Sequence, residues 1–74
     1  ELFARGNLAL ALLRIGEPER ALPEYRTFVE KARSPRIIGF IIADVEDLIE
    51  AQPDTPGAQE ALEMLQEAAK ALEE

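Results

Sequence analysis

The spacing of apolar residues along the chain predicts four helices. In residues 2–15 apolar side chains occupy nearly every face: Leu8, Leu12 and Ile15 share one, and Phe3, Leu10 and Leu13 lie on others. A helix that is apolar all round is covered on more than one side. We therefore expect the first helix to be the most enclosed of the four.

Three further segments, 18–33, 35–52 and 55–73, show apolar residues at helical steps of three and four. Ser34-Pro35 and Thr55-Pro56 each combine a capping side chain with a proline suited to the first helical position. Residues 18–33 also contain Pro23, and an interior proline costs a helix about 3 kcal/mol. This helix therefore starts near Ala21, or it bends at Pro23 while the packing of Tyr25, Phe28 and Val29 offsets the cost.

Residues 37–42 are rich in isoleucine and, taken alone, also fit a buried strand. The helical steps continue through Val45, Leu48 and Ile49 between acidic residues, which favours a helix. Because the breaks between segments are short, consecutive helices must lie nearly antiparallel. The prediction is a single all-α domain, 1–74, made of two helical hairpins (2–34 and 35–73). The absence of an initiator Met suggests that it was excised from a longer protein.

The first hairpin resembles a tetratricopeptide repeat (TPR), a helical hairpin of about 34 residues. The matching residues cover 2–35: Asn7, Leu8, Ala9, Leu12, Gly16, Ala21 and Tyr25. Arg5, Phe28 and Pro23 depart from the family pattern. Residues 36–73 resemble a degenerate second unit. The resemblance implies part of a right-handed superhelix, in which small Ala9 and Ala21 let the two helices approach while Leu8, Leu12 and Tyr25 fill the space around them.

The resemblance also implies a function, because stacked repeats bind peptides or proteins on the wall formed by the first helix of each pair. That wall would carry Phe3, Asn7, Leu10 and Arg14. Two units are few for such an array. We therefore expect Leu10, together with Leu13, Phe40 and Ile41, to be covered by further repeats or by a second copy. The alternative is that four helices close on themselves and bury these side chains.

Charge is divided unevenly along the chain. Residues 1–36 hold seven basic and five acidic side chains (net +2), and residues 37–74 hold one basic and ten acidic (net −9). The total of −7 opposes binding to nucleic acid or to an anionic membrane. A basic protein, or the basic half of another copy, is a more suitable partner. Acidic residues that simply solubilise exposed helix faces are the alternative.

The chain is poor in residues for catalysis. It has no histidine, no cysteine and a single serine, so Ser-His-Asp catalysis, the usual zinc sites and disulfides are excluded. An acyl carrier role fails because the nearest motif, Glu46-Asp47-Leu48, lacks the serine that carries the prosthetic group. Asp44, Asp47 and Glu50 recur at steps of three, which suits either a small carboxylate metal site or, preferably, a solvated face.

The sequence thus predicts a protein-interaction module without catalysis, metal or cofactor, which binds a peptide or protein partner and self-associates. A helical accessory or regulatory domain of a larger enzyme is the alternative.

Overall fold

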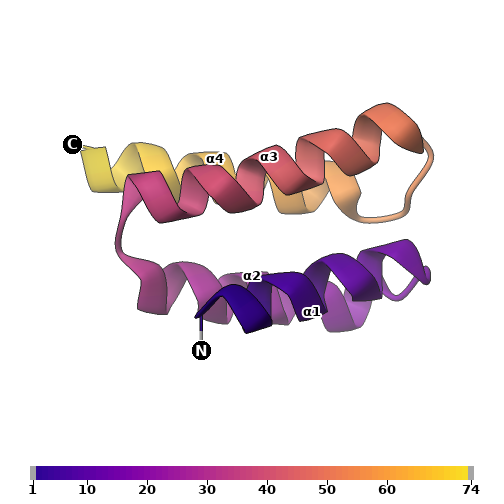
Figure 1. The fold of residues 1–74 in the computed structure, drawn as a ribbon, viewed down its shortest axis with the longest axis horizontal. Helices are drawn as coiled ribbons and strands as arrows, with labels where there is room; N and C mark the ends of the chain where they lie inside the picture. Colours follow the sequence, from indigo (N-terminus) through magenta and orange to yellow (C-terminus); the bar gives the residue numbers. More distant parts are fainter. Residues whose placement is uncertain (1, 74) are drawn as a thin grey trace.

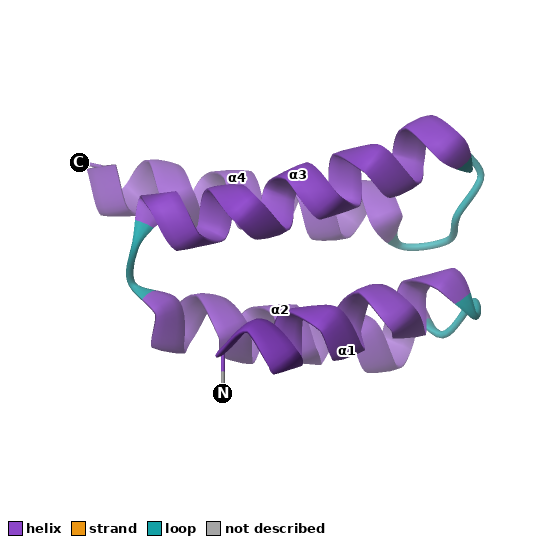
Figure 2. Cartoon of the chain, viewed as in Figure 1, coloured by secondary structure: helices purple, strands orange, loops and turns teal. Residues whose placement is uncertain are grey.

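The computed structural model describes residues 2–73, and this part of the chain is helical and contains no strand. Its helices are α1 (Leu2–Arg14), α2 (Pro18–Ala32), α3 (Pro35–Ala51) and α4 (Ala58–Glu73). The all-α prediction is confirmed, and residues 37–42 lie within α3 rather than in a strand. Helices α1 and α2 form one layer and α3 and α4 form a second layer stacked upon it (Figure 1). Short loops join all four helices (Figure 2).

The turn between α1 and α2 follows from its glycine. Gly16 has a φ of 78°, and its N–H donates to the Leu13 carbonyl while the Glu17 N–H donates to the Leu12 carbonyl. This pair of bonds is the Schellman arrangement, which satisfies the last carbonyls of a helix when a residue without a Cβ takes the left-handed conformation. Pro18 then opens α2 at the position where a missing N–H costs least.

Helix α2 runs through Pro23 without interruption from Pro18 to Ala32. Of the two expectations for this proline, the start near Ala21 is therefore wrong. Pro23 itself is exposed, whereas Ala21, Tyr25 and Phe28 are fully buried on the opposite side. Burying two large aromatic side chains contributes roughly 3–6 kcal/mol, which offsets the cost of the proline.

The two Ser/Thr-Pro pairs behave differently. Ser34 caps α3 as predicted, because its Oγ accepts the N–H of Ile37 at 3.3 Å. Thr55 does not cap α4, which begins at Ala58 rather than at 55. Instead its Oγ1 donates to the Gln52 carbonyl, and Gly57 has a φ of 80°, a backbone conformation that no α-helical residue adopts. The longer loop is therefore a correction to the predicted boundary.

One core joins the two layers. It draws on all four helices, with the larger buried side chains being Tyr25, Phe28, Leu13, Ile38, Leu65 and Val45. The layers meet closely at Gly6 of α1, where an added Cβ would lie 2.8 Å from Cδ1 of Ile41 in α3. Glycine at this position allows α3 to approach α1. Both helices begin at the same end of the domain (Figure 1).

Candidate functional site: the α1–α3 face

Two aromatic rings mark the face that α1 and α3 share. Phe3 lies in the first turn of α1 and Phe40 in the second turn of α3, and their ring centroids are 6.5 Å apart at an angle of 58°. Such tilted pairs are favoured by about 1 kcal/mol beyond the area they bury. Both side chains remain about half exposed, at 45% and 54%. A hydrophobic ring pair is thus held in contact with solvent at one end of this face.

Polar side chains continue the face away from the rings. On α1, Asn7 and Arg14 follow Phe3 at a helical step of four and then two turns later, and both are exposed. On α3, Asp44 and Asp47 follow Phe40 at steps of four and three, half-buried and exposed respectively. We call the surface formed by these side chains the α1–α3 face: Phe3, Asn7, Arg14, Phe40, Asp44 and Asp47. Because each row follows one side of its helix, apolar, amide and charged groups succeed one another along the face.

Three residues predicted to need cover from outside the chain lie inside it. Leu10, Leu13 and Ile41 are 8%, 0% and 3% exposed, so they are unavailable to a partner or to a second copy. The reason is the close approach at Gly6, which lets the second hairpin cover this side of α1. Leu13, Ile41 and Leu10 are therefore corrections to the predicted sites, whereas Phe3, Asn7, Arg14 and Phe40 are exposed.

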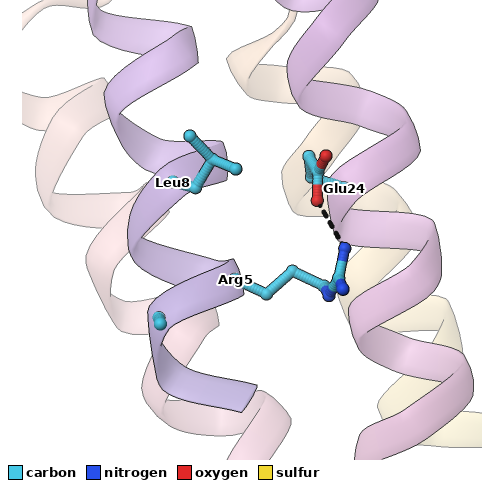
Figure 3. A pocket seen from close by; sticks show the side chains of 4 residues that line it. Arg5, Leu8 and Glu24 are labelled. Atoms are coloured by element: carbon cyan, nitrogen blue, oxygen red, sulfur yellow. Dashed lines mark hydrogen bonds and ion pairs between the residues drawn. The ribbon is translucent and has the colours of Figure 1, made fainter. Parts of the chain in front are cut away.

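The apolar residues of α1 that do remain in solvent are different ones. Leu8 is 47% exposed and Ile15, just after the helix, is 65% exposed. The family resemblance assigned Leu8 to the contact between α1 and α2, but it points outward beside a depression of about 270 Å³ (Figure 3). Ala9, Leu12 and Leu13 fill the buried side instead. The sequence pattern does not distinguish these leucines, because apolar residues occur on nearly every side of α1; their exposed fractions in the structure do.

The depression beside Leu8 is lined by Ala4, Arg5, Leu8 and Glu24 (Figure 3). Arg5 donates to Glu24 at 2.7 Å across α1 and α2, which explains how a charged residue is tolerated where the family favours an apolar one. Both side chains are about one-third exposed, so the pair stabilises the fold by less than about 1 kcal/mol. The depression is smaller and more open than the clefts that enclose small molecules.

A buried hydroxyl lies close to the α1–α3 face. Tyr25 of α2 is fully buried, and its hydroxyl has no hydrogen-bonding partner among residues 2–73. Burial raises the pKa of Tyr25 well above its ordinary 10.0; the nearby Asp44 carboxylate raises this pKa further and Arg14 lowers it. The sequence indicated Tyr25 only as a packing residue. Nothing in its spacing shows that the hydroxyl would lack a partner.

Within residues 2–73 no three His, Cys, Asp or Glu side chains come together in a metal-binding group, and Asp44, Asp47 and Glu50 lie along α3. None of the helices described is long and apolar enough to cross a membrane. No protein-family model, curated protein or solved structure matches this chain. The resemblance to tetratricopeptide repeats therefore stays a prediction from the residues alone.

Proposed function

We propose that this domain is a protein-interaction module that binds a peptide segment on the α1–α3 face and performs no catalysis. The observation that carries the proposal is the half-exposed pair of Phe3 and Phe40, held together by two helices from different hairpins. Large aromatic side chains that stay accessible on a rigid surface are the common anchors of protein interfaces. The tetratricopeptide resemblance independently suggests the same helix as the binding wall.

The chemistry of the face suggests what the peptide carries. Its apolar end suits one large aliphatic or aromatic side chain against the two rings. Further along, Asp44 and Asp47 suit a lysine or arginine, while the amide of Asn7 can both donate to and accept from a peptide backbone. We therefore expect a ligand with an apolar anchor and a basic residue.

Selection from a display library of random peptides tests this proposal directly. Peptides enriched on the folded chain should carry the anchor and the basic residue, and a labelled representative then gives affinities by fluorescence polarisation. Phe40→Ser should weaken binding at least about tenfold, since it removes an anchor contact of about 1.4 kcal/mol or more. Asn7→Ala should weaken it less.

Leu8→Ser is the matched control, because Leu8 is as exposed as Phe3 and lies on the same helix but on another side. Its affinity for the selected peptide should equal that of the original chain. If enriched peptides lack an apolar anchor, or if Phe40→Ser binds them unchanged, the α1–α3 face is not the binding surface.

A further inference from the structure

The outer side of the first hairpin carries an apolar stripe with basic neighbours. Ala4, Leu8, Ala11 and Ile15 follow helical steps of four, three and four, and all four side chains are exposed. We call them the α1 stripe. A row on α2 borders it, because Glu24 in that row pairs with Arg5 and lines the depression beside Leu8. The row is Arg20, Glu24, Thr27 and Lys31. Together with Arg5, and with Glu17, which pairs with Arg20, it gives three basic and two acidic groups.

The outer side of the second hairpin has the opposite charge. On α3, Ile42 and Ile49 flank the exposed Glu46, and on α4, Leu62 and Ala69 flank the exposed Gln66. The four apolar side chains are half-buried against the core, in rows next to those that face the first hairpin. Helices α3 and α4 lie side by side, so these two rows are neighbours, and we use the term α3–α4 groove for the four apolar residues together with Glu46 and Gln66. Acidic residues dominate its surroundings: Glu46, Glu50, Glu63 and Glu73, against the single Lys70.

We infer that copies of this chain associate head to tail, with the α1 stripe of one copy seated in the α3–α4 groove of the next. The charges favour this occupant. Residues 1–36, which include the stripe, have a net charge of +2, and residues 37–74, which include the groove, have a net charge of −9. Two stripes or two grooves facing each other would bring like charges together. The inference goes beyond peptide binding, since both surfaces lie away from the α1–α3 face.

The dimensions of the domain set the expected strength. Its extents are 32 × 22 × 16 Å, and the hairpins stack along the intermediate axis (Figure 1). Each outer side therefore offers about 500 Å², or about 1,000 Å² for two copies in contact, near the lower limit for a specific interface. Association should accordingly be weak and salt-sensitive. Because the two surfaces differ and lie on opposite outer sides of the domain, copies add end to end in an open array, and the assembly lengthens with concentration.

Sedimentation equilibrium on the intact chain tests the inference, over roughly 10–500 µM protein and at about 50 and 500 mM salt. The average mass should rise above the 8.2 kDa of one chain without reaching a plateau, and it should fall at high salt. Two variants each block one surface. Leu8→Glu with Ile15→Glu blocks the stripe, and Glu46→Lys with Glu50→Lys blocks the groove. All four positions are exposed, so both variants should retain helicity by circular dichroism.

Each blocked variant alone should sediment as a single chain, whereas an equimolar mixture should form a complex of two chains, because one intact stripe then meets one intact groove. A single-chain mass for the unmodified protein throughout would overturn the inference. So would association of the groove-blocked variant alone, which would indicate stripe-to-stripe contact, or a mixture that stays monomeric. If glutamate at 8 and 15 disrupts the helix, glutamine at both positions provides the second stripe-blocked variant.

Phe40→Ser separates this inference from peptide binding. It should associate like the unmodified chain while losing affinity for the selected peptide, and the stripe-blocked variant should do the reverse. Loss of self-association in Phe40→Ser, with helicity retained, would place the contact on the α1–α3 face and would contradict the head-to-tail arrangement.

Discussion

Two glycines with the same backbone conformation provide a test of how the hairpins are held together. Gly16 and Gly57 lie in the two hairpin turns with φ values of 78° and 80°. They differ in their surroundings: a Cβ at Gly16 would meet nothing within 4 Å, whereas a Cβ at Gly57 would overlap Cβ of Pro18. The loop before α4 thus rests directly on the first residue of α2. Because the proline ring is rigid, no side-chain rotation can relieve that contact.

The two replacements by alanine should therefore have different costs. A left-handed backbone costs an L-residue about 1–2 kcal/mol, and this applies equally at both turns. Overpacking against Pro18 adds roughly 1–3 kcal/mol at Gly57 only. Gly16→Ala should thus lower the free energy of unfolding by about 1–2 kcal/mol and Gly57→Ala by about 2–5 kcal/mol. For a domain of this size, each kcal/mol lowers the melting temperature by about 4–8 °C.

Urea unfolding followed by circular dichroism at 222 nm would measure both values. The excess cost of Gly57→Ala should shrink when it is combined with Pro18→Gly, since that change removes the Cβ that the new methyl group meets. Pro18→Gly alone supplies the baseline for this double-mutant cycle. Equal losses for Gly16→Ala and Gly57→Ala, or an excess that persists in the Pro18→Gly background, would refute the packing of the loop on α2.

Three further predictions concern single side chains. Ser34→Ala should lower the melting temperature by the equivalent of about 1 kcal/mol while Ser34→Asp retains it, because only the latter can accept the Ile37 N–H; equal melting temperatures would exclude a capping role. Tyr25 is the only tyrosine, so absorbance at 295 nm follows its ionisation alone. Its pKa should exceed 10.0 in the folded chain and return to about 10 in urea. Because the pKa of Tyr25 is higher in the folded chain than in the unfolded chain, the stabilisation from keeping its hydroxyl protonated is complete below pH 10. This stabilisation is lost as pH rises through the folded-state pKa, and the stability of Tyr25→Phe should not show this decline. A folded-state pKa of 10 would contradict the burial. Gly6→Ala should change the stability by less than about 1 kcal/mol, since a gain of about 1 kcal/mol in helix propensity offsets displacement of the flexible end of Ile41, whereas Gly6→Leu should cost about 1–3 kcal/mol by overpacking; thermal melts in which Leu is tolerated would refute close contact of α1 and α3.

The sequence contained enough information for most of the fold. Helices α2, α3 and α4 have apolar and polar sides, and the break at Gly16-Glu17-Pro18 and the cap at Ser34 are local signals that act within a few residues. These features depend on neighbouring residues, so spacing alone reveals them. The predicted start of α4 at residue 55 is wrong, because Thr55-Pro56 has the same residue pattern as the true cap at Ser34-Pro35. The difference comes from Gly57, whose left-handed backbone follows at once and delays the helix.

The candidate site was only half predictable, because it depends on how separate helices lie against each other. The family resemblance and the helical spacing together gave Phe3, Asn7, Leu10 and Arg14 as one row of α1; three of these residues are exposed, but Leu10 is buried. Spacing could not show that Phe3 would meet Phe40, since no local pattern gives the register between two helices. Spacing also could not show which of Leu8, Leu10 and Leu13 would be exposed to solvent. That depends on the approach of α3 to α1 at Gly6, which is a tertiary contact.

The distribution of exposed apolar residues is the strongest reason to regard α1 as the binding element. Single exposed leucines are normal on soluble proteins and need no function. Here, however, four of the five exposed large apolar side chains among residues 2–73 are concentrated: Phe3, Leu8 and Ile15 belong to α1 or its end, and Phe40 contacts Phe3. The fifth, Leu72, lies near the end of α4. By contrast, the outward residues of α2 and α4 are mostly charged or amide. A chain that simply solubilised all its helices would show the same charged surface on α1. Because α1 instead exposes apolar groups on two separate sides, one helix can support a peptide contact beside α3 and a contact with a second copy on the stripe.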